Sequence, residues 1–271
     1  EKVHGERSLL FLYGNGSLFS RILTYVIAKV SFFSHLYGLF QKSFFSRKKI
    51  KKFVEEYGIR KEEFQKDLSE FTSFNDFFIR RLKPGCRPVV QGSETAVMPA
   101  DGRYLVFQDL FSVDGFYVKG QKFSLENFLQ SRLLADEYQR GAMVIARLNP
   151  TDYHRFHFPI DCIPSEAELM NGLLYSVNPI ALRKNISIFT ENKRKITSCF
   201  SDLFGRVLMV EVGATNVGTI HQTYTPEENV QKGDEKGFFS IGGSGIVLLF
   251  EKGKIEFDAD LIENSKRKIE T

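Results

Sequence analysis

A serine preceded by two glycines, Gly242-Gly243-Ser244, stands directly before Gly245 and an apolar run at 246–250. By itself such a tetrapeptide is typical of a flexible turn. A chemical role is also open, because a serine hydroxyl can attack the carbonyl of the preceding residue, and a glycine there adopts strained backbone angles at low cost. This N-to-O acyl shift, followed by elimination across the serine Cα–Cβ bond, releases the upstream chain. The dehydroalanine that remains hydrolyses to a pyruvoyl group.

A base must activate that hydroxyl, and a further group must orient the base. The segment 152–158 contains His154 and His157, two of only five histidines, and prolines on both sides disfavour a long helix there. In an extended segment, histidines three residues apart face opposite sides, which disfavours a shared metal ion and favours two separate tasks. Asp101, in the polar turn 98–102, could supply the orienting carboxylate. Either histidine alone is more often structural, and an Asp-Gly pair is more often only a turn.

Composition describes an ordinary globular protein. The 271 residues suffice for a sizeable core, and the net charge of +4 is too mild to suggest nucleic-acid binding. Three cysteines without a close pair, Cys86, Cys162 and Cys199, argue against a disulfide framework and against a cysteine-rich metal site. They favour a reducing compartment. No Gly-rich dinucleotide-binding or phosphate-binding motif occurs.

The most apolar stretch is 17–45, where apolar residues recur at helical spacing. Arg21, Lys29 and Lys42 interrupt it, so it lacks the roughly 20 mostly apolar residues of a membrane-spanning helix. Six basic residues and no acidic one lie within 42–52. Two interpretations remain open: an amphipathic helix packed on the protein's own core, or a helix in a bilayer interface. In the second interpretation, each Lys or Arg near the bilayer surface contributes about 1 kcal/mol of binding free energy through attraction to anionic head groups.

The expected secondary structure changes along the chain. After the helical N-terminal part, short apolar runs bounded by Gly, Pro and Asp predict strands, including a hairpin of 246–250 and 255–257. The segment 124–139 is predicted to be a helix within this strand-rich part. The predicted fold is therefore α+β. N-terminal amphipathic helices form a membrane-associating region, 1–82, and a β-rich catalytic domain of antiparallel or mixed sheets follows, 83–271.

Several ordered motifs together resemble those of the phosphatidylserine decarboxylases, and the similarity to chlamydia-type bacterial members is close. The motifs are the Gly-Ser site, Phe74–Lys83 (FNDFFIRRLK), Pro99–Gly102 (PADG), Asp152–Pro159 (DYHRFHFP), Phe189–Arg194 (FTENKR), Val210–Thr215 (VEVGAT) and Phe257–Leu261 (FDADL). The resemblance covers nearly the whole chain from about residue 70. It implies a pyruvoyl-dependent enzyme that converts phosphatidylserine to phosphatidylethanolamine.

Carried over by position, the resemblance implies a self-cleavage triad of Asp101, His157 and Ser244. His157 would activate the hydroxyl, and Asp101 would orient the imidazole. The substrate amine would form a Schiff base with the pyruvoyl group derived from Ser244, and His154 would return a proton after loss of carbon dioxide. The family usually has Ser or Thr after the cleaved serine, where this chain has Gly245. Slower or incomplete maturation is the hypothesis that follows from this departure.

The implied cut between Gly243 and Ser244 would give a large chain, 1–243, and a small chain, 244–271. These two chains would form a heterodimer, and the resemblance also implies that two such heterodimers associate as a homodimer. The expected partners are phosphatidylserine and a membrane surface, reached by a peripheral protein at the cytoplasmic face of the cell membrane, with no metal ion and no nucleic acid. Two alternatives are a pyruvoyl-dependent decarboxylase of a soluble amino acid and a non-enzymatic module that binds anionic lipid. The Phe-rich, basic N-terminal region disfavours the first, since a soluble substrate needs no membrane dock.

Overall fold

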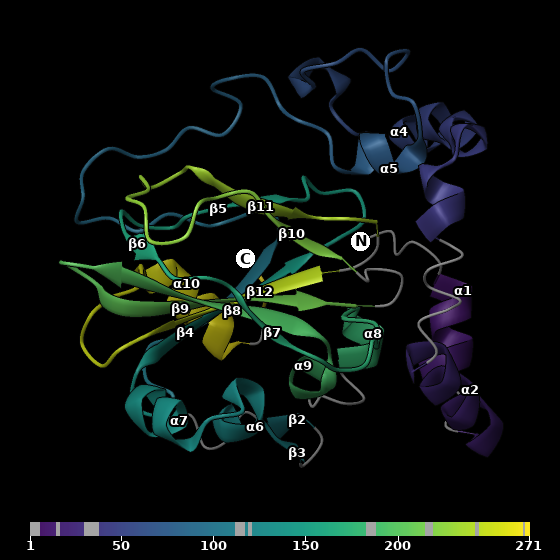
Figure 1. The fold of residues 1–271 in the computed structure, drawn as a ribbon. Helices are drawn as coiled ribbons and strands as arrows, with labels where there is room; N and C mark the ends of the chain where they lie inside the picture. The colour runs from purple at the N-terminus through teal and green to yellow at the C-terminus, as the bar shows by residue number, and fades with distance from the viewer. Residues whose placement is uncertain are drawn as a thin grey trace.

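The computed structural model describes residues 6–14, 17–29, 38–111, 117–118, 121–182, 188–214, 219–241, 244–267 and 269–271. Helices precede a strand-rich region, so the predicted α+β class is confirmed (Figure 1). The described helices are α1 (Glu6–Leu9), α2 (Leu18–Lys29), α4 (Lys49–Tyr57), α5 (Phe74–Phe78), α6 (Leu125–Leu129), α7 (Arg132–Tyr138), α8 (Pro179–Leu182), α9 (Ile188–Glu191) and α10 (Ala259–Lys266). A π-helical turn at Leu10–Gly14 and 3-10 turns at Phe44–Lys48 and Lys61–Glu63 accompany them.

An antiparallel sheet of seven strands forms the centre of the molecule, in the order β1-β4-β12-β9-β8-β6, with β7 also paired to β8. A second antiparallel sheet, β10-β11-β5, lies over one of its faces (Figure 1). The strands are β1 (Arg103–Phe107), β2 (Tyr117–Val118), β3 (Gln121–Lys122), β4 (Ala142–Leu148), β5 (Arg155–His157), β6 (Ile163–Pro164), β7 (Glu168–Met170), β8 (Arg194–Ser201), β9 (Gly205–Gly213), β10 (Ile220–Gln222), β11 (Glu235–Phe239) and β12 (Ser244–Phe250).

The central strands β4 and β12 are buried along their whole length. Both are mostly apolar because each of their faces is covered. On one face they pack with Phe156, Phe158 and Phe239 from the smaller sheet and its surroundings. On the other face they pack with Phe128 of α6 and Phe189 of α9. The strand that begins with the candidate nucleophile is therefore held rigidly in the middle of the core.

A third apolar cluster lies in the N-terminal part of the chain. Its buried members are Ile50, Phe53, Val54, Phe64, Phe71, Phe74, Phe77, Phe78 and Ile241. Several of its rings meet edge to face, for example Phe71 and Phe77 at 5.7 Å between centroids, a favoured arrangement of aromatic quadrupoles. Ile241 comes from the other end of the chain, three residues before Ser244. This cluster therefore adjoins the candidate site.

Two local expectations are wrong. The predicted hairpin does not form, because β12 pairs with β4 and β9, and residues 255–257 are not a strand. The segment 124–139 contains two helices, since Gln130 adopts a left-handed conformation with φ 49° and Ser131 caps the next helix. The N-terminal helices are short, and α4 ends at Gly58, which has φ 61° and forms a left-handed cap.

The predicted amphipathic helix near the N-terminus is present as α2, and residues 30–37 of the predicted stretch lie outside the described residues. Its buried positions are small and polar: Ser20 is fully buried, and Thr24 donates to the carbonyl of Leu12 at 3.1 Å. Most of its described apolar side chains are exposed, with Leu18 at 72% and Phe19 at 67%, while Leu23 is half-buried. Within the described part of the chain, no helix has the length and apolar character needed to cross a membrane.

Candidate active site

Ser244 is the first residue of β12, between Leu148 of β4 and Gly213 of β9. Its side chain is completely buried. Gly242 and Gly243, which carry the predicted cleavage position, lie outside the described residues. The hydroxyl therefore lies at the end of the central strand, where side chains from neighbouring loops can reach it.

His154 is such a partner. Its Nδ1 lies 3.4 Å from Ser244 Oγ, and its Nε2 lies 2.8 Å from the backbone carbonyl oxygen of Asn149. A carbonyl oxygen can only accept a hydrogen bond, so Nε2 carries the proton and Nδ1 presents a lone pair to the hydroxyl. This tautomer can act as a base toward Ser244.

Burial keeps the imidazole of His154 neutral. The pKa of His154 is lowered to about 3, first by burial and then by the nearby Arg80 cation, against the opposing effect of the bond to Asn149. A neutral imidazole at ordinary pH is the form that accepts a proton from a serine hydroxyl. The 3.4 Å separation is longer than a strong hydrogen bond, as is common for catalytic pairs before the reacting geometry is reached.

The short helix α5 supports this pair from the N-terminal side. The ring of Phe78 stacks on His154 with centroids 3.8 Å apart. The side-chain oxygen of Asn75 accepts a hydrogen bond from the backbone N–H of Ile241 at 3.3 Å. Ser73 caps the helix by accepting from the N–H of Asp76 at 3.1 Å. The helix therefore contacts both the histidine and the chain just before the serine.

Arg80, two residues after α5, is buried and donates to the carbonyl oxygens of Thr151 and Asp152 at 2.9 and 3.1 Å. Its guanidinium lies over the rings of Phe64 and Phe77, and burial lowers its pKa to about 10. The contacts fix the turn that precedes His154. Sequence reasoning used the motif around Phe78 and Arg80 only to carry the resemblance and assigned these residues no role. The sequence signal for these residues was a run of aromatic residues that ends in arginines. The partners of these arginines depend on the fold.

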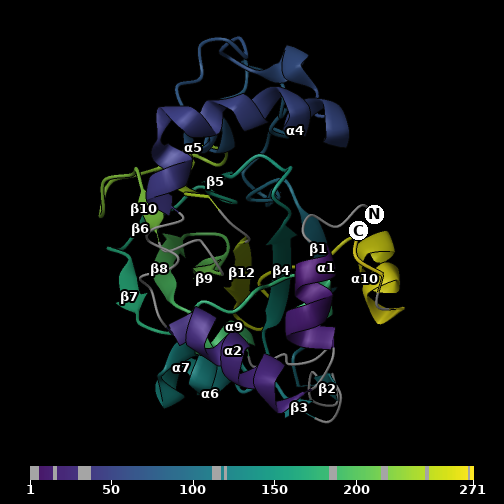
Figure 2. The same ribbon diagram turned by 90° about the vertical axis from the view of Figure 1, so that its right-hand side faces the viewer.

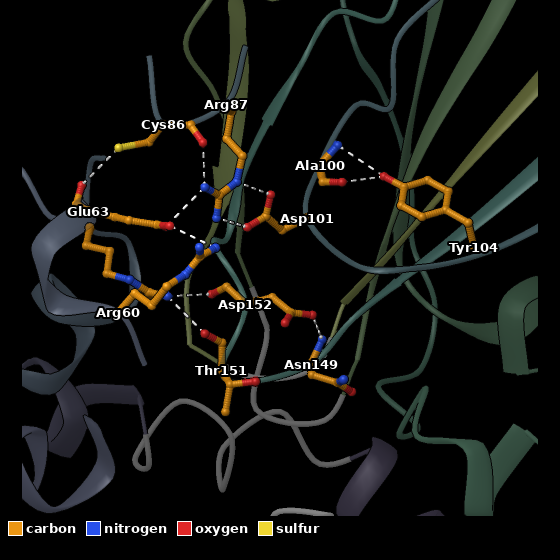
Figure 3. A network of polar contacts seen from close by, with 11 residues as sticks. Arg60, Glu63, Cys86, Arg87, Ala100, Asp101, Tyr104, Asn149, Thr151 and Asp152 are labelled. Carbon is orange, nitrogen blue, oxygen red and sulfur yellow. Dashed lines mark hydrogen bonds and ion pairs between the residues drawn. The ribbon is translucent and has the colours of Figure 1, made fainter. Parts of the chain in front are cut away.

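The structure places Asp101 in an ion network (Figure 3). Arg87 donates through Nε and Nη2 to the two carboxylate oxygens of Asp101 at 2.7 and 2.6 Å, and through Nη1 to Glu63 at 3.0 Å. The hydrogen bond that Arg87 donates to Asp101 is the largest cause that raises the pKa of Arg87. These contacts tie the turn at Lys61–Glu63 to the polar turn that contains Asp101.

His157 lies at the end of β5. Its Nδ1 is 2.8 Å from the carbonyl oxygen of Gly233, and its ring stacks on Tyr153 with centroids 5.8 Å apart. Its backbone N–H donates to the carbonyl of Pro99 at 2.7 Å, which brings the turn with Asp101 beside β5. Of the predicted site residues, the structure therefore brings Ser244 and His154 together. Both His157 and Asp101 have other partners in this structure.

Gly245 departs from the expected Ser or Thr, and its surroundings are tight. A Cβ atom at this position would lie 3.2 Å from the carbonyl oxygen of Ala146 and 3.2 Å from the ring of Phe189. A larger residue would require these neighbours to shift. Among the described residues, no three His, Cys, Asp or Glu side chains converge in a way that could hold a metal ion.

Comparisons with known proteins agree with the resemblance. A family model described as phosphatidylserine decarboxylase matches residues 74–269. A Chlamydia caviae protein named phosphatidylserine decarboxylase proenzyme is 47% identical over all 271 residues, which cover 90% of its own length. The proteins of the same name from Chlamydia muridarum and Chlamydia trachomatis serovar D are 52% and 50% identical. They match 90% and 93% of this chain and 81% and 83% of their own lengths.

Proposed function

Because the chain belongs to the phosphatidylserine decarboxylase family, we propose that it cleaves itself before Ser244 and then decarboxylates phosphatidylserine to phosphatidylethanolamine. Enzymes of this family are carboxy-lyases made as proenzymes, and they depend on a covalent pyruvoyl group. The observation that carries the proposal is the contact between the Ser244 hydroxyl and the neutral His154 imidazole at 3.4 Å.

The surroundings of Ser244 fit the formation of a pyruvoyl group. Its hydroxyl has a nitrogen base beside it, and β4 and β9 flank its strand on both sides. A new N-terminus at Ser244 would thus remain fixed in the sheet. When formed, the group supplies a ketone that condenses with the substrate amine and accepts the electrons left behind by carbon dioxide.

In the proposed cleavage, Nδ1 of His154 takes the hydroxyl proton as Ser244 Oγ attacks the carbonyl carbon of Gly243. The same proton then passes to the amide nitrogen of Ser244 as the C–N bond breaks, which leaves an ester. Phe78 and the carbonyl of Asn149 hold the imidazole during this transfer. Burial excludes water that would otherwise compete for the proton.

The assignment implied by the resemblance, with His157 as the base and Asp101 as its orienting group, is the alternative. The bond to Gly233 places the proton of His157 on Nδ1 and leaves Nε2 as its basic nitrogen. This assignment requires His157 to reach Ser244 and Asp101 to leave Arg87. The proton return to the substrate carbon would then be the task of His154.

Single variants distinguish the two assignments. Intact mass of freshly purified protein measures the fraction cleaved, with Ser244→Ala as the uncut reference. If His154 is the base, His154→Ala stays uncut, while His157→Ala is cleaved. The opposite pattern transfers the role to His157. A wild-type protein with only the uncut mass, matching Ser244→Ala, would refute self-cleavage itself.

After cleavage the two chains are proposed to remain together. The small chain would contain β12 and α10. In the sheet, β12 lies between β4 and β9 of the large chain. Separating them would expose the apolar core on both faces of β12. A homodimer of these heterodimers stays a prediction.

We further propose a membrane-docking surface at the N-terminal side. In addition to the apolar face of α2, Leu39, Phe40, Phe44 and Phe45 are exposed near the basic run 42–52. Both α2 and the α4–α5 region lie on the side of the molecule that faces the viewer in Figure 2. Apolar side chains beside basic ones suit an anionic bilayer surface. Location at the cytoplasmic face of the cell membrane is part of this proposal.

A further inference from the structure

His221 lies beside the chain that leads to Ser244, and the proposed reaction gives it no role. Its Nε2 is 3.1 Å from Oγ of Ser240, a buried residue four positions before Ser244. Its ring stacks on that of Phe238 in β11, with centroids 4.5 Å apart and an interplanar angle of 20°. The half-buried imidazole is therefore held in place at the edge strand of the smaller sheet.

Lys195 brings a positive charge to the same region from the central sheet. It lies on β8 opposite Glu211 of β9, which in turn lies opposite Ile246 of β12. Directly paired side chains share a face of the sheet, and so do those of Ser244 and Ile246, two residues apart on one strand. Lys195 therefore projects from the same face as Ser244, and two strand spacings, about 10 Å, separate their strands.

Lys42 approaches from the N-terminal part of the chain. The backbone carbonyl of its neighbour Gln41 accepts from Oγ of Ser46 at 2.8 Å. Ser46 Oγ in turn accepts from the backbone N–H of Phe74 in α5 at 2.8 Å. The same helix also bonds to the backbone N–H of Ile241. Helix α5 therefore anchors both the segment that contains Lys42 and the chain that leads to the nucleophile.

These three groups form a cationic cluster without an acidic partner. The charges of Lys42 and Lys195 add to the effect of burial in lowering the pKa of His221. Within the described part of the chain, no Asp or Glu forms an ion pair with either lysine. The side-chain oxygen of Gln41, a residue only 1% exposed, also has no hydrogen-bond partner among the described residues. Like charges repel, and an unpartnered buried amide is uncommon, so both features suit a bound anion.

We propose that Lys42, Lys195 and His221 form a subsite for a phosphate anion, which receives the phosphodiester of the phospholipid substrate. This inference rests on the proposed function. In such a substrate, an ester oxygen and two carbons separate the phosphorus from the amine that condenses at Ser244. A phosphate held at the cluster would therefore direct that amine to the face of the sheet from which Ser244 projects. The exposed apolar side chains beside Lys42 would then meet the acyl chains.

Turnover of short-chain phosphatidylserine in neutral detergent micelles tests the subsite without an anionic bilayer. Lys42→Ala and Lys195→Ala are each expected to raise KM about tenfold, the effect of losing one charge-assisted hydrogen bond. Because the phosphate does not react, kcat should change by less than about twofold. Lys252→Ala, which removes an exposed lysine elsewhere on the surface, should leave KM unchanged. Intact mass confirms beforehand that each variant is cleaved.

The titration of His221 provides a readout that a merely structural role would not move. In uncut Ser244→Ala protein labelled with 15N-histidine, glycerophosphoserine should raise the pKa of His221, because an anion beside an imidazole favours its protonated form. Adding Lys195→Ala should abolish this shift, whereas adding Lys252→Ala should not. Serine, which lacks the phosphate, should produce no shift. Inorganic phosphate, which lacks the ester, should need a higher concentration for the same shift.

The outcomes separate this proposal from the one on which it rests. Unchanged KM in both cluster variants, an equal rise in Lys252→Ala, or no response of His221 to glycerophosphoserine would overturn the subsite. A His221 shift with inorganic phosphate but none with glycerophosphoserine would assign a site for free phosphate and overturn the role in substrate binding. A wild-type protein that stays uncut, or that is cut but inactive, would count against the proposed function, while the titration of uncut protein still tests the cluster.

Discussion

The burial of a neutral His154 makes the stability of the fold depend on pH in a defined range. The pKa of His154 is about 3 in the folded protein and takes its ordinary value near 6.5 when unfolded. Below about pH 6.5 the unfolded chain therefore binds a proton that the folded chain does not bind, so stability falls as the pH falls toward 3. Between pH 7.5 and 5.0 this single group should lower the free energy of unfolding by about 2 kcal/mol.

The measurement is urea unfolding at several pH values within that range, in the Ser244→Ala background so that one uncut species is present. His154→Gln removes the titrating group, and its loss of stability over the range should be smaller than that of the parent by the same amount, about 2 kcal/mol. Contributions from other titrating groups are common to both proteins. Val144→Ala, a core variant without a titrating group, controls for lower stability alone. An equal pH dependence with and without His154 would refute the neutral, buried base.

Two further predictions concern a buried ion pair and the N-terminal surface. Lys236 and Glu211 are fully buried and joined at 2.8 Å. Lys236→Ala should lower the free energy of unfolding by about 3–5 kcal/mol, because it leaves a buried carboxylate without its cation, whereas the exposed Lys252→Ala should change it by less than about 0.5 kcal/mol. Equal urea midpoints would contradict this. Replacing both Leu18 and Phe19 with Ser should reduce flotation with vesicles that contain anionic lipid, while Leu133→Ser, at a leucine that is 83% exposed, should not. Equal flotation of all three proteins would argue against docking by α2.

The strand-forming segments could be predicted from the sequence, but their pairing could not. Apolar runs such as Ile246–Phe250 signal strands because a doubly covered strand needs no polar face. An apolar run does not indicate with which other strand it pairs. A hairpin with 255–257 was the local solution, yet β12 pairs with β4 and β9, which are distant in sequence. Burial of both faces of β12 in the centre of the sheet outweighs the short connection that a hairpin would have offered.

The amphipathic pattern of α2 was predicted, whereas the direction of its faces was not. Periodicity defines an apolar face and a polar face, but it does not say which one meets the protein. In the structure, Ser20 and Thr24 are buried, while Leu18 and Phe19 are exposed. Small hydroxyl side chains can pack closely and bond to backbone carbonyls, as Thr24 does with Leu12. The choice between core and membrane therefore depends on contacts that only the fold provides, and the exposure of Leu18 and Phe19 is what supports the proposed membrane-docking surface.

The choice between two histidines illustrates the same limit at the site. The sequence limits the candidate bases to His154 and His157 and indicates that their side chains point in opposite directions. It cannot say which of the two histidines contacts Ser244. That depends on the turn 149–152, whose position is set by Arg80 on one side and Arg147 on the other. Arg80 bonds to this turn from 71 and 72 residues away, whereas Arg147 bonds to it from two residues away and is itself held by Glu270, 123 residues further along the chain. A motif written as consecutive letters omits these contacts. In the proposed assignment, the base is the histidine that this turn places beside Ser244.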